Sequence, residues 1–175
     1  MAKTVKRYGV FFLLVLANIM IGLALPDIGR KALDITKRNL VEMLSVIPPI
    51  FILLGLMDVW IDRATMMKYT GNGSGIQGIL IAFLLGSAAA GPLYAAFPVA
   101  GVMLKKGSSL MNVFIFIGAW STTKIPMLTF EAASLGPAFT LTRLTLSIVG
   151  IMIIAAVTQK SLSGAQQRGI YEINQ

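Results

Sequence analysis

Long apolar segments alternate with short polar stretches along the chain, and this pattern predicts membrane-spanning helices. The segments are residues 8–25, 40–61, 76–104, 108–135 and 138–157, and the polar tail is residues 158–175. About 20 apolar residues in a helix cross the hydrocarbon core of a bilayer. The pattern therefore predicts an all-α polytopic membrane protein with about 4–6 transmembrane segments. We expect residues 1–175 to form a single membrane domain with a frayed tail.

Glycine and proline interrupt the third and fourth of these segments. The expected breaks are at Gly91, Pro92, Pro98 and Pro126. Proline removes a helical hydrogen bond, and hydrocarbon offers the freed backbone groups no partner. Each segment is therefore expected to be either a re-entrant hairpin or a broken helix that crosses fully, with protein or a wet cavity around the break. Paired interruptions of this kind indicate the substrate site of a transporter.

Several other stretches carry expectations about local structure. Residues 27–39 mix charged and apolar side chains, which suits either a short helix in the headgroup plane or a solvated loop. Pro48 and Pro49 should kink the second segment. Residues 61–75 end in a glycine-rich run, which we interpret as a flexible linker. The small side chains of residues 86–91 favour close contact between helices.

Polar side chains within the apolar segments are candidates for function, because an ionisable group there costs several kcal/mol unless it is paired or wet. The candidate substrate-binding residues are Lys124, Ser121, Thr122, Thr123, Tyr94 and Glu131. Lys124 lies where a helix must stop, so hydroxyls and freed N–H groups should surround it and suit an anionic or polar solute. The alternative is an exposed loop in which Lys124 only meets lipid headgroups.

The remaining polar residues leave alternatives open. Glu131 can act in transport, either by pairing with Lys124 or Arg143 or by carrying a proton that drives transport. Alternatively it has a structural role, as part of an ion pair or as an interfacial carboxylate that caps the last half-helix. Arg143 lies near the start of the last segment, where we expect it to snorkel to the interface rather than contact substrate. The Tyr94 phenol can donate to a substrate or pack within a helix.

Composition supports the membrane class and narrows the chemistry. Hydrophobic residues make up 56% and charged residues 13% of the chain, whereas soluble domains carry about a quarter charged residues. Cysteine and histidine are absent, so we expect no metal site and no cofactor. The net charge is +8, and the basic residues lie in short loops beside apolar segments. We therefore expect these residues to contact anionic lipids of the bilayer rather than nucleic acid. We expect a multi-pass protein of the cell (cytoplasmic) membrane.

The run from Gly91-Pro92 through Pro98 to Lys105-Lys106-Gly107 resembles the signature of the predicted permease family that includes the organoarsenical efflux permease. The following stretch, residues 108–126, is similar to the next segment of that family. The resemblance implies a helical permease. The arsenical branch carries cysteines in the first break, where this chain has Tyr94 and two alanines. The resemblance therefore does not identify the substrate.

The chain is about half the size of longer family members, which implies a single repeat that works as a homodimer. If all apolar segments cross, nine basic residues lie on the N-terminal side and four on the other, which favours an N-terminus inside the cell. If both broken segments are re-entrant, the counts are seven and six. So small a bias permits both orientations and therefore an antiparallel, inverted-repeat dimer.

Three functions compete on these observations. The first is a permease that moves a small solute past the paired breaks. The second is a non-transporting membrane subunit whose breaks and small residues dock a partner protein. The third is a membrane enzyme that uses Glu131, Lys124 or Tyr94, but the sequence contains no recognisable nucleophile–base pair. We therefore expect a permease and no enzymatic activity.

Overall fold

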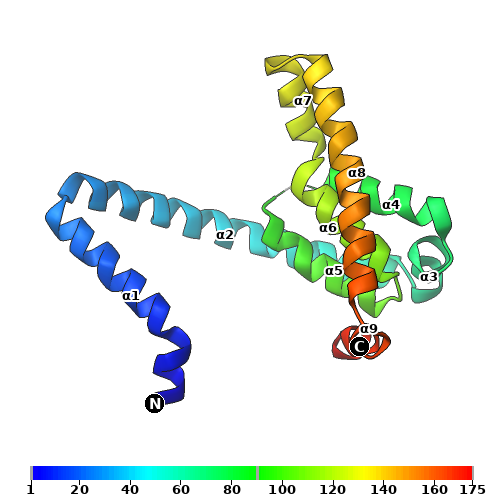
Figure 1. Cartoon of the computed structure of the whole chain (residues 1–175), viewed down its shortest axis with the longest axis horizontal. Coiled ribbons are helices and arrows are strands. Elements are labelled where there is room, and N and C mark those ends of the chain that lie inside the picture. The colour runs from blue at the N-terminus through cyan, green and yellow to red at the C-terminus, as the bar shows by residue number, and fades with distance from the viewer. Residues whose placement is uncertain (1, 90, 175) are drawn as a thin grey trace. The chain divides into compact units, whose positions relative to one another are not determined.

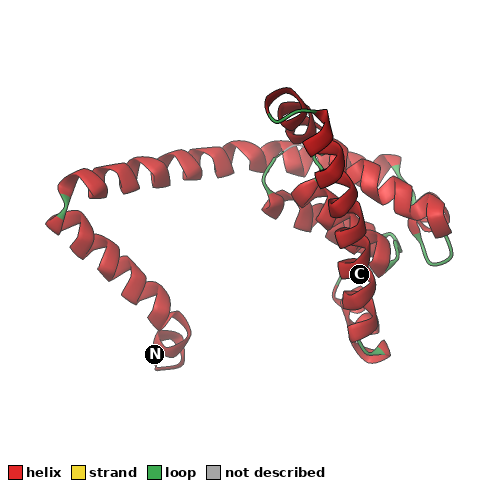
Figure 2. Ribbon diagram, turned by 45° about the horizontal axis from the view of Figure 1, so that its top comes forward, coloured by secondary structure: helices red, strands yellow, loops and turns green. Residues whose placement is uncertain are grey.

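The computed structural model describes residues 2–89 and 91–174, and for residues 2–7, 54, 57 and 58 it describes the backbone alone. Helices joined by short loops form these ranges, and no strand occurs within them (Figure 2). The predicted all-α fold class is confirmed. Ala90, in the small-residue run 86–91, and the side chain of Asp58, in the second apolar segment, lie outside what is described.

The chain divides into two compact units, residues 1–48 and 49–175. The first unit contains helix α1 (Ala2–Ala24) and the beginning of helix α2 (Pro26–Trp60), which form an open, V-shaped hairpin whose helices diverge from the turn (Figure 1). The two backbones approach closely beside the turn, since a Cβ added at Gly29 would lie 2.7 Å from the Cα of Gly22. The hairpin is therefore closed at its turn by two glycines.

Helix α2 corrects the expectation for residues 27–39. These residues form neither a separate short helix nor a loop, because α2 continues as one helix of 35 residues. Pro26 opens it at a position where its missing N–H costs nothing. No glycine or proline occurs from residue 30 to residue 47, so nothing ends the helix before the two following prolines. The helix continues through Pro48 and Pro49 without ending.

The expectation of a flexible linker at residues 61–75 is also wrong, because these residues contain helix α3 (Arg63–Thr70). Asp62 caps this helix, and its Oδ1 accepts a hydrogen bond of 3.2 Å from the Thr65 N–H. Hydrogen bonding by Thr65 lowers the pKa of Asp62 below its ordinary value. The last residue of α3 also has a hydrogen-bond partner, since Asn112 Nδ2 donates to the Thr70 carbonyl at 2.9 Å.

The C-terminal tail is helical rather than frayed. Helix α9 (Gly164–Ile173) begins with a capping box in which Ser163 and Gln166 exchange hydrogen bonds. Tyr171 then donates to the carbonyl of Ser108 at 2.9 Å, which holds α9 against the loop between α5 and α6. Burial raises the pKa of Tyr171 above its ordinary value. A cap and a long-range hydrogen bond thus order a segment of polar composition.

The second unit packs around helix α6 (Leu110–Thr122). Helix α4 (Gly75–Ala88) lies on one side of α6, and helix α8 (Pro137–Ser161) lies on another (Figure 1). Glycine permits both close approaches: an added Cβ at Gly86 would lie 2.4 Å from the Phe116 carbonyl oxygen, and one at Gly118 would lie 2.9 Å from Ile151. The 3-10 helix η1 (Leu93–Ala95), helix α5 (Ala96–Lys105) and helix α7 (Ile125–Ser134) also belong to this unit, together with α3, α9 and the end of α2.

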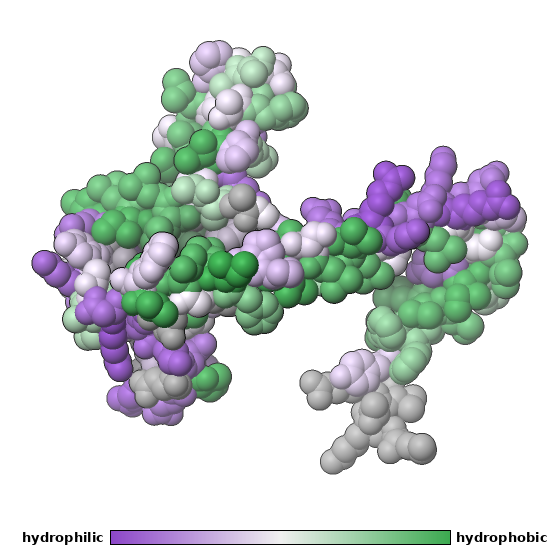
Figure 3. Space-filling model, turned by 180° about the vertical axis from the view of Figure 1, so that it is seen from behind, coloured by the Kyte–Doolittle hydropathy of each residue, from purple (hydrophilic) through white to green (hydrophobic). Residues whose placement is uncertain are grey.

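Two stretches in the described part of the chain are long and apolar enough to cross a membrane: Leu110–Ser134, which joins α6 and α7, and Pro137–Ser161, which is α8. Three shorter apolar helical stretches accompany them, Tyr8–Ala24, Gly75–Ala88 and Leu93–Lys105. Figure 3 shows broad apolar surfaces on both units. Such surfaces suit contact with lipid rather than water. The number of crossings stays a prediction.

The close packing of α4 on α6 leads to a stability prediction. Gly86→Ala should lower the free energy of unfolding by about 1–3 kcal/mol, because the new methyl group must displace the backbone of α6. Gly150→Ala is the matched control, since a Cβ at Gly150 in α8 would meet nothing within 4 Å. Equilibrium unfolding in detergent measures both variants. Equal stability of the two variants would contradict the close approach.

Candidate functional site

The two interrupted segments lie next to each other in the second unit. Helix α4 ends at Ala88, and the chain reaches η1 through Gly91, whose φ of 105° favours glycine. In the other segment α6 ends at Thr122 and α7 begins at Ile125, with two residues between them. Both loops therefore free backbone groups within otherwise apolar stretches.

The prolines occupy different places in these segments. Pro92 directly precedes η1, and Pro126 lies in the first turn of α7, where a missing N–H leaves no bond unmade. Pro98 does not break a helix as expected. It is exposed and lies in the first turn of α5. The helix tolerates it there because a backbone N–H in the first turn has no partner within the helix.

Lys124 connects the two loops directly. Its Nζ donates a hydrogen bond to the carbonyl oxygen of Gly91, and the Trp120 Nε1 donates to the same oxygen at 3.3 Å. Gly91 belongs to the first loop, whereas Trp120 belongs to α6 and Lys124 to the second loop. The half-buried Lys124 is thus directed towards the first loop rather than away from the protein.

Hydroxyl groups make a second connection between α4 and the end of α6. The Ser87 and Thr123 hydroxyls lie 2.8 Å apart, and Thr123 also donates to the Ala119 carbonyl at 3.1 Å. Because Thr123 has a single hydroxyl hydrogen, Ser87 is the donor in their shared bond. Thr122 donates to the Gly118 carbonyl at 2.9 Å. These bonds fix the last turn of α6 beside Lys124.

Glu131 and Arg143 form an ion pair between α7 and α8. Arg143 Nε lies 2.6 Å from Glu131 Oε2, and Arg143 Nη1 donates to the carbonyl of Thr122 at 2.9 Å. Glu131 is buried at 6% exposure, and the Arg143 side chain is 23% exposed. Arg143 Nη2 is buried and finds no hydrogen-bond partner among the described residues.

Arg143 is thus held by protein groups, and its expected position at the membrane interface stays a prediction. The buried carboxylate of Glu131 and the free carbonyl at the end of α6 offer it charge-assisted hydrogen bonds, which are stronger than neutral ones. Of the alternatives for Glu131, the structure realises pairing with Arg143 rather than with Lys124. A role for Glu131 in carrying protons stays a prediction.

A groove of about 540 Å³ lies beside these residues, between α4, α7 and α8. Its lining is apolar except for Ser87 and Thr123, whose hydroxyls already bond each other. Leu80, Leu128 and Ile148 are among the apolar lining residues. The groove can hold an apolar group while a polar end of the same molecule reaches the hydroxyls.

The structure brings together only some of the predicted site residues. Thr122, Thr123 and Lys124 follow one another at the end of α6, and Glu131 is linked to the Thr122 carbonyl through Arg143. Thr123 and Lys124 each bond to the first interrupted segment, at Ser87 and Gly91. Ser121 and Tyr94 are exposed, and no described residue hydrogen-bonds to either side chain. Neither belongs to this hydrogen-bonded group.

Sequence reasoning underrated Arg143 and missed the roles of Trp120 and Ser87. A signal for Arg143 was present, since Glu131 and Arg143 lie at similar distances before and after the turn at Gly136-Pro137. A helical hairpin at this turn brings such positions together, and α7 does lie beside α8 (Figure 1). No comparable local signal identifies the Gly91 carbonyl as a shared acceptor.

The fold and this group of residues define an all-α membrane protein with polar side chains gathered at two helix ends. Residues 29–172 match the family described as predicted permease, and the chain belongs to this family. Membership implies a membrane transporter and not an enzyme. No curated protein and no solved structure matched the chain.

The ion pair gives a prediction that a double-mutant cycle can test. Glu131→Ala should lower the free energy of unfolding by about 3 kcal/mol, the low end for a buried pair, because Arg143 keeps partial contact with solvent. Glu131→Ala combined with Arg143→Met should cost less than Glu131→Ala alone, since no unpaired charge remains. Equilibrium unfolding measures all variants, and strictly additive effects would contradict the pairing.

Proposed function

We propose that this chain is a permease that moves a small solute through a site between the two interrupted segments. The observation that carries the proposal is the contact between Lys124 of one loop and the Gly91 carbonyl of the other. Interrupted helices that meet within apolar surroundings are the usual architecture of transporter sites. The Ser87–Thr123 bond supports the same location, because it also joins the two segments.

The charges at this site favour an anionic solute or one with a partly negative end. Lys124 and Arg143 are positive and Glu131 is negative, so these three residues leave one surplus positive charge. Lys124 is held by a neutral carbonyl and not by a carboxylate. An anion can therefore replace that hydrogen bond without separating an ion pair. The Nη2 of Arg143, which has no hydrogen-bond partner among the described residues, is a second unpaired donor near this site.

The working form that we propose is a homodimer in the cell (cytoplasmic) membrane, with each chain crossing several times. A single repeat supplies one pair of interrupted segments, and two repeats related by inversion allow alternating access around a fixed site. The small difference in basic residues between the two sides supports an antiparallel arrangement if both interrupted segments are re-entrant.

Removal of the central cation tests the site. Lys124→Ala should reduce solute movement at least tenfold while the protein still folds and inserts, because the solute loses its charged partner. Proteoliposomes loaded with radiolabelled phosphate, benzoate or neutral benzamide provide the measurement. The movement compared is the excess over protein-free liposomes, because benzamide crosses lipid unaided, and this excess should be larger for the anions than for the amide.

The matched control for this experiment is Lys105→Ala, which removes an exposed cation at the end of α5 and should leave transport unchanged. A fully active Lys124→Ala variant would remove the proposed site. Faster movement of benzamide than of benzoate would contradict the proposed preference for anions.

Orientation can be measured cleanly because the chain lacks cysteine. Single cysteines at Lys3 and at Gln166 are labelled in intact cells with an impermeant thiol reagent, before and after permeabilisation. An antiparallel dimer predicts that each site is about half accessible from outside, since chains insert both ways. Complete protection of the Lys3 site would mean one orientation and would exclude the inverted dimer.

A further inference from the structure

The beginning of helix α2 separates charged from apolar side chains around its circumference. With about 100° of rotation per residue, all the charged positions from residue 27 to residue 38 fall within an arc of about 120°. The cations are Arg30, Lys31, Lys37 and Arg38, and the carboxylates are Asp27 and Asp34. Figure 3 shows hydrophilic side chains along one side of this stretch and apolar ones along the other. Such a helix suits a membrane surface.

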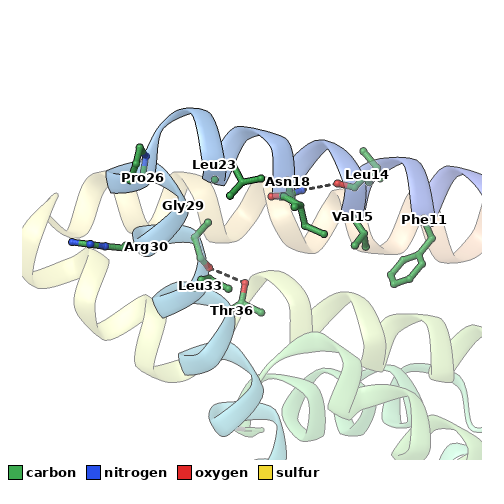
Figure 4. Close-up of a pocket in the computed structure, with 13 residues that line it drawn as sticks. Phe11, Leu14, Val15, Asn18, Leu23, Pro26, Gly29, Arg30, Leu33 and Thr36 are labelled. Atoms are coloured by element: carbon green, nitrogen blue, oxygen red, sulfur yellow. Dashed lines mark hydrogen bonds between the residues drawn. The ribbon is translucent and has the colours of Figure 1, made fainter.

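The apolar side of this stretch faces a cavity of about 770 Å³ within the α1–α2 hairpin (Figure 4). Apolar side chains such as Phe11, Val15 and Leu33 supply most of its lining. The two uncharged polar side chains in the lining bond to their own helices: Asn18 donates to the Leu14 carbonyl and Thr36 to the Ala32 carbonyl. The cavity wall therefore presents little hydrogen-bonding capacity and suits a hydrocarbon chain.

One of the four cations lines this cavity, and a second lies on the same face of α2 without being part of the lining. Arg30 is part of its lining, and Lys37 lies seven residues further on the same face of α2, about two turns away. Lys31 and Arg38 form a second such pair, about 100° further around the helix and outside the cavity. An apolar cavity with a cationic edge is complementary to a molecule that joins an acyl chain to an anionic headgroup.

We propose that the α1–α2 hairpin binds an anionic phospholipid. An acyl chain occupies the cavity between the two helices, and the phosphate-bearing headgroup contacts Arg30 at its edge and Lys37 on the same face of α2. The charge of the edge favours an anionic headgroup over a zwitterionic one. The site lies within the first unit and is independent of the transport site proposed around Lys124.

The experiment places a fluorescent reporter in the cavity of the full-length protein. Val15→Cys, labelled with bimane, is reconstituted with phosphatidylglycerol or phosphatidylcholine whose acyl chains are brominated. Bromine quenches bimane at short range, so quenching reports an acyl chain beside residue 15. Brominated phosphatidylglycerol should quench more strongly than brominated phosphatidylcholine at the same mole fraction.

Two charge-matched variants in the same background assign the headgroup contact. Arg30→Gln with Lys37→Gln should weaken the apparent affinity for phosphatidylglycerol on the order of tenfold, since each cation near the surface attracts anionic lipid. Lys31→Gln with Arg38→Gln removes the same charge outside the cavity and should leave the preference in place.

Three results would overturn the proposal, and the first two need no charge variant. Equal quenching by the two lipids would mean that the hairpin does not select a headgroup. Absence of quenching by both would mean that protein, such as a second copy of the chain, covers the cavity. Equal loss of preference in the two double variants would mean that overall charge and not the cavity edge attracts the lipid.

Discussion

The second unit depends on how the ends of helices that are interrupted within apolar segments find hydrogen-bond partners. In hydrocarbon no water replaces a lost helical hydrogen bond, so a free carbonyl must find a donor within the protein. The Gly91 carbonyl has two donors, Lys124 and Trp120, and both come from the other interrupted segment. Each segment thus needs the other, and their mutual dependence holds α4, α5, α6 and α7 in one arrangement.

The same constraint explains the position of Arg143. The end of α6 leaves the Thr122 carbonyl free, and the α7–α8 hairpin brings a guanidinium to it. A partly buried guanidinium is stabilised by a counter-charge, which Glu131 supplies from α7. One arginine therefore satisfies a helix end and joins three helices. The two cations of the site have different partners, since Arg143 is held by a carboxylate and Lys124 by a neutral carbonyl.

This difference bears on how the proposed transport site is both stable and responsive. The ion pair of Arg143 with Glu131 stabilises the packing of α7 on α8, whereas the hydrogen bond of Lys124 is exchanged at lower cost. Close glycine contacts at Gly86 and Gly118 hold α4 and α8 against α6 around these groups. The first unit has a simpler design, in which a glycine contact closes a hairpin and leaves an apolar cavity with a cationic edge.

The sequence by itself determined the helical membrane class, because long apolar segments and few charges leave helices as the structure that satisfies its own backbone. It also indicated that Gly91, Pro92 and Lys124 matter, since glycine, proline and charge are conspicuous in apolar segments. Tertiary structure decided which groups meet. Lys124 reaches a carbonyl 33 residues away, and Thr70 and Ser108 bond across 38 residues. Helix α3 and the tail helix α9 depend on such distant bonds and on caps, so polar composition alone suggested disorder there. Periodicity reports local geometry, whereas partners separated by tens of residues are fixed only when the helices pack.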